Sequence, residues 1–167
     1  AIMVGGDEAV LSHCLPVLES MGQRITHMGP NGMGQTTKLV NQILVAGTLS
    51  AVAEAMVFAA AHGSDLEKTI DAVGAGAAGS WQLSNLGPRM INGDFAPGFM
   101  IKLQQKDLRL VLEAGSASNV PLAVTALSKE WLGIAESLGA SEEGTQAIIK
   151  SVEKLAGVVA RRPNSSN

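Results

Sequence analysis

The feature that most constrains the fold is a long stretch of sequence almost without charge. From residue 43 to residue 61 the one ionisable side chain is Glu54, and the remaining residues are Ala, Val, Leu, Ile, Met, Phe, Gly, Ser and Thr. A helix that is apolar on every side is a buried helix. We therefore predict a central helix inside a helical bundle, where its many small residues favour close packing. Because Glu54 interrupts the stretch before the roughly 20 residues that a membrane span requires, we expect no membrane partner.

A glycine-rich segment leads into this helix. It reads Gly-Pro-Asn-Gly-Met-Gly from residue 29 to residue 34, and Lys38 and Gln42 follow one helical turn apart on one face. A lysine at the mouth of a buried helix is partly desolvated, which suits it to proton transfer. The alternative is a lysine whose ammonium group extends to solvent. The residues alone leave both interpretations open.

Composition excludes several classes of function. The chain of 167 residues is 46% hydrophobic and 16% charged, which is sufficient for a core. With a net charge of -3 and no basic cluster, we expect no nucleic-acid partner. The single cysteine, Cys14, cannot form an internal disulfide, so a soluble cytoplasmic protein is expected. We interpret Cys14 as buried filler rather than as a thiol–base pair with His13. Cysteine and histidine spacing predicts no metal site.

The start of the chain predicts a small strand–helix–strand unit. Residues 1–4 form an apolar strand, Asp7 caps a helix over about residues 8–21, and residues 23–28 form a second short strand. Strands joined by a helix pair in parallel, but two strands alone make a poor sheet. We therefore interpret residues 1–29 as the last part of a larger nucleotide-binding domain, in a chain that is a piece of a longer protein. No signal peptide is apparent.

Residues 30–160 are expected to be all-helical, and residues 161–167 to form a flexible tail. After the central helix, Ser64 and Glu67 form a capping box for a helix to about residue 73. Further helices are predicted over about residues 80–90, 101–117, 120–137 and, capped by Ser141, 141–156. Residues 74–79 spell G-x-G-x-x-G, but a dinucleotide-binding turn must follow a strand. We interpret this segment as a loop between helices, and residues 92–99 as a second, turn-rich loop.

Two separated motifs resemble the signature of the β-hydroxyacid dehydrogenase family. Gly29, Gly32, Gly34 and Lys38 fit the pattern G-x-x-G-x-G-x-x-x-K, in which the family's lysine is catalytic, and residues 106–108 match its K-D-L block. The family includes 3-hydroxyisobutyrate dehydrogenase, tartronate semialdehyde reductase and glyoxylate/succinic semialdehyde reductase. Nearly the whole chain resembles the latter part of such an enzyme. The resemblance implies a mainly α fold: a helical domain similar to the C-terminal domain of 6-phosphogluconate dehydrogenase, after a short βαβ remnant of a Rossmann domain.

The resemblance also implies an activity, namely reversible reduction of a short semialdehyde or 2-oxo acid to a hydroxy acid with NAD or NADP. Such a reaction needs a proton donor for the developing oxyanion. The sequence has no tyrosine, and no histidine is paired with a carboxylate at a helix start, which leaves Lys38 as the best-placed donor. Asn41 and Gln42 would support the lysine and bind substrate oxygen.

The remaining site residues also come from the resemblance. It places Trp81 and Asp107 near substrate, and Phe99 and Lys106 near the cofactor. Each has a plainer interpretation: Trp81 as a core or interface anchor, Phe99 as a loop aromatic that becomes buried, and Lys106 as part of a solvated helix face carrying salt bridges. The sequence Gln-Lys-Asp-Leu-Arg at residues 105–109 weakly favours the glyoxylate/succinic semialdehyde reductase branch.

The sequence departs from the family pattern in two positions. The commonest motif has Asn four residues after the catalytic lysine, whereas this chain has Gln42 there and Asn41 one residue earlier. Glu113 stands where the K-D-L block often ends in Asp. The family's phosphate-binding turn and its S-G-G substrate loop are absent from this chain, so we expect the isolated chain to be inactive. The competing interpretation is a non-catalytic helical oligomerisation module; a homo-oligomer, a dimer or a tetramer, is expected in either case.

Overall fold

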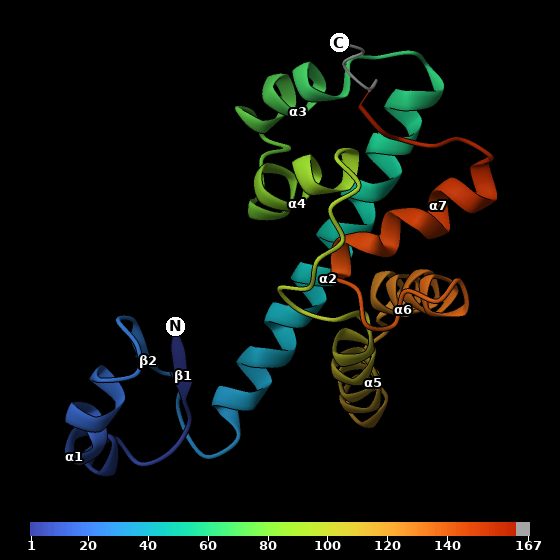
Figure 1. The fold of residues 1–167 in the computed structure, drawn as a ribbon. Helices are drawn as coiled ribbons and strands as arrows, with labels where there is room; N and C mark the ends of the chain where they lie inside the picture. The colour runs from blue at the N-terminus through green and yellow to red at the C-terminus, as the bar shows by residue number, and fades with distance from the viewer. Residues whose placement is uncertain (163–167) are drawn as a thin grey trace. The chain divides into compact units, whose positions relative to one another are not determined.

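The computed structural model describes residues 1–162, and the chain folds as two compact units (Figure 1). The first unit comprises residues 1–42 and the second begins at Ile43. The elements in chain order are β1 Ile2–Val4, α1 Glu8–Glu19, β2 Ile25–His27, α2 Met33–Ala61, α3 Leu66–Gly74, α4 Trp81–Ile91, α5 Ile101–Ala117, α6 Ala123–Ser137, the 3₁₀ turn η1 Thr145–Ile148 and α7 Ile149–Ala156. The mainly helical fold with short strands at its start is confirmed. The predicted domain boundary after residue 29 stays a prediction.

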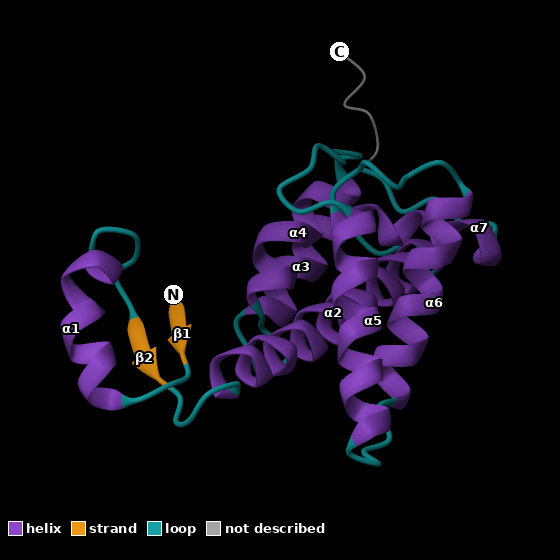
Figure 2. Cartoon of the chain, turned by 90° about the horizontal axis from the view of Figure 1, so that it is seen from below, coloured by secondary structure: helices purple, strands orange, loops and turns teal. Residues whose placement is uncertain are grey.

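The first unit is the predicted strand–helix–strand unit. β1 and β2 pair in parallel, with Ile2 opposite Ile25 and Val4 opposite His27, and α1 lies beside them (Figure 2). Asp7 caps α1 as expected, because its carboxylate accepts hydrogen bonds from the amides of Ala9 at 2.8 Å and Val10 at 3.1 Å. The strands are three residues long, shorter than the predicted ones.

The glycines around the start of α2 serve two different physical purposes. Gly29 and Gly32 have φ angles of 107° and 93°, a region that residues with a side chain rarely adopt. Gly34 instead lies against the end of β1, where an added Cβ would be 2.5 Å from the carbonyl oxygen of Met3. The tight turn and the close approach together set where α2 starts relative to β1.

The central helix α2 is buried along one face rather than on every side, so the prediction of complete burial is wrong for this chain. Ala46, Leu49 and Ala53 are buried, whereas Leu44 and Phe58 are 63% and 67% exposed. Composition alone cannot distinguish a helix covered on all sides from one with an uncovered apolar face. Among the described residues, α2 is the one helix long and apolar enough to cross a membrane, but a core helix of a soluble protein passes the same test.

The second unit is a helical bundle. α5 and α6 form a helical hairpin, α3 packs on α4, and α7 packs on α6 (Figure 1). α2 meets α6 through a buried polar contact, because the hydroxyl of Ser50 donates to the hydroxyl of Ser128 at 3.0 Å. Leu108 on α5 and Leu132 on α6 are fully buried and contribute to the main core cluster.

Helix starts agree with the sequence prediction to within a few residues, and the caps agree less often. α4 begins at Trp81, close to the predicted start, with Ser80 as its cap, but α3 is capped by Asp65 rather than by the predicted Ser64. The predicted start of the last helix at Ser141 is wrong, since η1 and α7 begin only at Thr145, whereas its predicted end at about residue 156 is confirmed. Ser141 and Glu143 present their carbonyl oxygens to the first amides of α5, at 3.1 and 3.0 Å. Because these carbonyl oxygens bind α5, they do not form the hydrogen bonds of a helix that begins at Ser141.

The chain after α7 returns to the bundle. The amide of Arg162 donates to the carbonyl of Ile91 at 2.9 Å, and the Arg161 guanidinium pairs with the buried carboxylate of Glu153. The first two residues of the predicted tail are therefore anchored, and residues 163–167 lie outside the described part of the chain.

Candidate functional site

The first group of predicted site residues lies in the first turns of α2. The Lys38 ammonium group donates to Oε1 of Gln42 at 3.2 Å, and the side-chain amide of Asn41 donates to the same oxygen at 3.0 Å. Residues four apart on a helix are neighbours, so this contact follows from the local spacing. One amide oxygen thus holds the lysine, although Gln42 is one methylene longer than the Asn found in the commonest family motif.

Exposure differs sharply within this group. Gln42 is buried, with 3% of its surface exposed, whereas Lys38 and Asn41 are exposed. Of the two interpretations that the residues left open for Lys38, the exposed position agrees with an ammonium group that extends to solvent rather than with a partly desolvated one. A buried amide next to an exposed lysine fixes the direction of the ammonium group while leaving it open to a ligand.

The second group lies on α5, in the second unit. The Lys106 ammonium group forms an ion pair with Asp107 at 2.8 Å, and the two side chains are 56% and 13% exposed. An ion pair with so exposed a lysine contributes little to stability. The salt-bridged face that the sequence predicted is also present, because Arg109 pairs with Glu113 at 2.8 Å. α5 therefore presents an accessible cation at Lys106 beside a largely buried carboxylate at Asp107.

The two predicted aromatic site residues are both on the surface. Trp81, the first residue of α4, is 65% exposed, so the interpretation as a core anchor is wrong for this chain. Trp131 on α6 packs against the core instead. Phe99 lies two residues before α5 and is 40% exposed, so the interpretation of Phe99 as an aromatic that becomes buried is also wrong. Both rings are accessible to a ligand.

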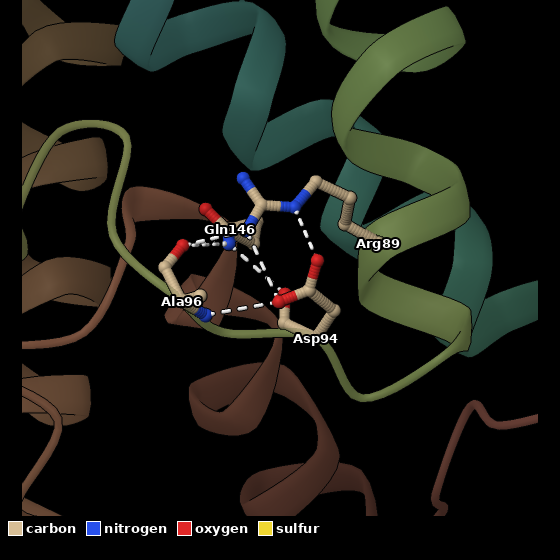
Figure 3. Close-up of polar contacts among 4 residues, drawn as sticks. All are labelled: Arg89, Asp94, Ala96 and Gln146. Atoms are coloured by element: carbon tan, nitrogen blue, oxygen red, sulfur yellow. Dashed lines mark hydrogen bonds and ion pairs between the residues drawn. The ribbon is translucent and has the colours of Figure 1, made fainter.

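The loop that carries Phe99 is held by side chains that the sequence did not indicate (Figure 3). Arg89, in the last turn of α4, donates from Nε and Nη2 to the Asp94 carboxylate at 2.8 and 3.1 Å, and from Nη2 to the carbonyl of Ala96 at 2.6 Å. Gln146 on η1 donates from Nε2 to the carbonyls of Asp94 and Ala96 at 3.0 and 3.1 Å. We call Arg89, Asp94 and Gln146 the loop clamp.

Electrostatics and backbone contacts support the same loop. Hydrogen bonds from Arg89 and from the Ala96 amide hold the pKa of Asp94 below its ordinary value, and Asp94 in turn raises the pKa of Arg89. The Thr145 amide donates to the Phe99 carbonyl at 2.9 Å. Gln146 lies far from Asp94 in sequence, so no local pattern could have indicated this contact.

Two further predictions concern cysteine and metals. Cys14 is exposed on α1, so its interpretation as buried filler is wrong. The Nδ1 atom of His13 lies 2.9 Å from the carbonyl oxygen of Ala9, a local contact within the helix. Within residues 1–162, no cluster of three or more His, Cys, Asp or Glu side chains is arranged to hold a metal ion.

Comparison with known proteins identifies the family. The family described as "NAD-binding of NADP-dependent 3-hydroxyisobutyrate dehydrogenase" matches residues 32–152. The chain therefore belongs to the 3-hydroxyisobutyrate dehydrogenase family, a group of β-hydroxyacid oxidoreductases that use NAD or NADP. This agrees with the resemblance carried by the lysine motif and the K-D-L block.

Individual relatives and solved structures agree with this family assignment. An uncharacterized oxidoreductase of Synechocystis is 48% identical over 150 residues, which is 90% of this chain and 51% of that protein. The 2-hydroxy-3-oxopropionate reductase of Escherichia coli is 42% identical over 93% of this chain and 53% of its own length. Crystallised 3-hydroxyisobutyrate dehydrogenase from Salmonella typhimurium has a TM-score of 0.82 at 30% identity, covering 87% of this chain and 52% of that one. The chain thus spans about half the length of the relatives that it matches.

Proposed function

We propose that this chain is the C-terminal, helical part of an NAD(P)-dependent β-hydroxyacid dehydrogenase that interconverts a short semialdehyde or 2-oxo acid and the corresponding hydroxy acid. The observation that carries the proposal is the oriented lysine, since Gln42 holds Lys38 at 3.2 Å within a motif that resembles the family's catalytic-lysine signature. On this proposal residues 1–29 are the end of the nucleotide-binding domain, residues 30–160 the substrate and dimerisation domain, and the remainder a tail.

Lys38 serves as the acid and base. During reduction, the Lys38 ammonium group donates a proton to the substrate oxygen as negative charge develops there, and solvent then reprotonates the amine. Gln42 orients the ammonium group by accepting one of its protons, and Asn41 supplies an amide for the same substrate oxygen. In the oxidation direction the neutral lysine takes the hydroxyl proton.

Residues of the second unit are proposed to bind the cofactor and to contact the parts of the substrate that Lys38, Asn41 and Gln42 do not contact. NAD(P)H supplies the hydride when it is bound. The residues present fit such a group, because Phe99 offers an accessible ring face and Lys106 a largely exposed ammonium group for an anionic portion. Asp107 and Trp81 are proposed to contact substrate. The Asp107 carboxylate is only 13% exposed and is paired with Lys106, so its position is fixed before substrate binds.

The test joins this chain to the half of the Synechocystis relative that it does not match, placed upstream. Oxidation of NADH or NADPH is followed by absorbance with a panel of semialdehydes and glyoxylate. Lys38→Ala should lower kcat by about 100- to 10,000-fold, the usual contribution of a positioned acid. Lys154→Ala is the matched control, because Lys154 is an exposed helical lysine without a proposed role. A rate that survives Lys38→Ala would refute the assignment.

The same assay addresses the isolated chain. The proposal expects no turnover, or almost none, from residues 1–167 alone, because the phosphate-binding turn is not in this sequence. Lys38→Ala is not expected to unfold the protein, since substitutions at exposed positions change stability by about 0.5 kcal/mol or less. Robust lysine-dependent turnover by the isolated chain would contradict the expected inactivity and leave the role of Lys38 intact.

A second candidate function is oligomerisation, which the uncovered face of α2 favours. Leu44 and Phe58 on α2, and Val124 and Leu127 on α6, are each more than half exposed. Apolar surface of this kind is typical of a subunit interface. We propose a cytoplasmic homo-oligomer, a dimer or a tetramer, and light scattering tests it: a monomer at high concentration would count against this function without affecting the catalytic assignment.

A further inference from the structure

We propose that Arg89, Asp94 and Gln146, the loop clamp, are positioning residues that set Phe99 for the cofactor; the inference rests on the proposed function. The loop from Asn92 to Met100 has no helix or strand of its own, and it carries an aromatic residue with 40% of its surface exposed. A ring so exposed has little packing of its own to fix it. Its position must therefore come from the backbone that bears it.

The clamp holds that backbone from two directions. Arg89 reaches it from α4, with three hydrogen bonds to Asp94 and Ala96, and Gln146 reaches it from η1, with two hydrogen bonds to carbonyls of the same residues. Gln146 is 1% exposed, so its donors have no water to replace these carbonyls. Figure 3 shows both side chains converging on the segment between Asp94 and Ala96.

Further contacts extend the hold to both aromatic residues of the loop. The Lys150 ammonium group lies 4.4 Å from the centre of the Phe95 ring, with Arg161 on the same ring at 5.2 Å. The Gly144 amide donates to the Phe95 carbonyl and the Thr145 amide to the Phe99 carbonyl, each at 2.9 Å. Because η1 carries Gln146 and Thr145 together, releasing the clamp loosens the hydrogen bond at Phe99 itself.

The clamp also reaches the start of α5. Met100 provides no side-chain cap for this helix, and its first amides are instead bound by the carbonyls of Ser141 and Glu143, in the segment that precedes Gln146. Lys106 and Asp107 follow about one and a half turns later on α5. The clamp therefore acts on cofactor and substrate contacts through the backbone, and it takes no part in the proton transfer assigned to Lys38.

The first test uses the full chain labelled with fluorophenylalanine, which gives three signals because the sequence has three phenylalanines. Arg89→Gln removes the guanidinium hydrogen bonds that α4 makes to the loop. Gln146→Met keeps a side chain of similar length but removes the amide donor, and with it the hydrogen bonds from η1. Both should shift the Phe99 signal toward that of free fluorophenylalanine and speed exchange of the Thr145 amide about tenfold. Phe58, on α2, should be unchanged. Arg109→Gln is the matched control, because it breaks an exposed pair on α5 that does not touch the loop.

Two results in this test would overturn the proposal. An unchanged Phe99 signal in both variants would show that the ring does not depend on the clamp. Equal loss of protection at Leu108 and Leu132, in the core of α5 and α6, would show a general loss of stability rather than positioning.

The second test uses the fused enzyme described above. Arg89→Gln and Gln146→Met should raise KM for the reduced cofactor that the fused enzyme oxidises, NADH or NADPH, about tenfold while kcat stays within about twofold, in contrast to Lys38→Ala. A fall in kcat with unchanged KM would overturn the assignment to the cofactor side. If the fused protein shows no lysine-dependent rate, the proposed function fails, and the fluorine signals still decide whether the clamp sets Phe99.

Discussion

Gly34→Ala tests how the glycine pattern specifies the start of α2. Gly34 is helical, and alanine within a helix is ordinarily more stable than glycine by about 0.5–1 kcal/mol. Here an added Cβ would be 2.5 Å from the carbonyl oxygen of Met3 and 3.0 Å from the amide nitrogen of Gly5, whereas ordinary contact is 3.4–4 Å. Both neighbours are backbone atoms, so a flexible side chain cannot absorb the overlap.

The overlap should reverse the usual sign of the substitution. Overpacking costs about 1–3 kcal/mol, which exceeds the gain in helix propensity, so Gly34→Ala should destabilise the first unit by roughly 1–2 kcal/mol. Exchange of the Met28 amide, which donates to the Val4 carbonyl at 2.7 Å across the sheet, reports on that unit. Its rate should rise about 5- to 30-fold.

The control is a helical glycine in open space. Gly74 ends α3, and nothing lies within 4 Å of an added Cβ. Gly74→Ala should leave exchange at Met28 unchanged and raise the free energy of unfolding by up to about 1 kcal/mol. If Gly34→Ala instead slows exchange at Met28, the close approach of α2 to β1 does not limit this position and the argument is refuted.

Other substitutions test the second unit. Glu153→Gln removes the charge that binds Arg161. Because the Arg161 side chain is 27% exposed, the free energy of unfolding should fall by about 1–2 kcal/mol, less than for a fully buried ion pair. Urea unfolding measures this change, and the m-value should stay the same. Leu108→Ala, at a fully buried position, should cost about 2–5 kcal/mol in the same assay. The hydrogen bond from Arg89 lowers the pKa of Asp94 in the folded protein. The ionised Asp94 therefore stabilises the fold at pH values above its ordinary pKa, and this stabilisation is lost as the pH falls through the lowered pKa of the folded state. Asp94→Asn should therefore flatten the dependence of Tm on pH below about pH 4, and an unchanged slope would contradict the pairing.

Much of the local structure follows from the sequence because its causes are local. Asp7 and Ser80 cap helices where a short polar side chain precedes an apolar run, and Gly29 and Gly32 occur where the turn needs positive φ. The contact between Lys38 and Gln42 follows from the helical period alone. Family membership was likewise predictable, because it is carried by residue types at fixed spacing.

Several errors arose where packing or a partner distant in the chain decides the structure. Ser141 was predicted to cap a helix, but the carbonyls of its segment bind the start of α5. The alternative interpretation of Trp81, as a core or interface anchor, came from its residue type, but Trp81 is exposed and Trp131 packs against the core instead. The apolar composition of α2 indicated burial, yet the helix has an uncovered face, because composition does not reveal which surfaces meet.

The sequence by itself thus determined most of the helices, the cap of α1 by Asp7, the lysine motif and the family, since each depends on neighbours a few residues apart. Only the tertiary structure decided how the loop before α5 is held. The clamp joins Arg89 and Asp94 to Gln146, and hydrogen bonds across such a separation form only after the bundle has brought α4 and η1 together. Loop positions without a periodic pattern carry no local signal of their partners, so the surroundings of Phe99 could come only from the fold.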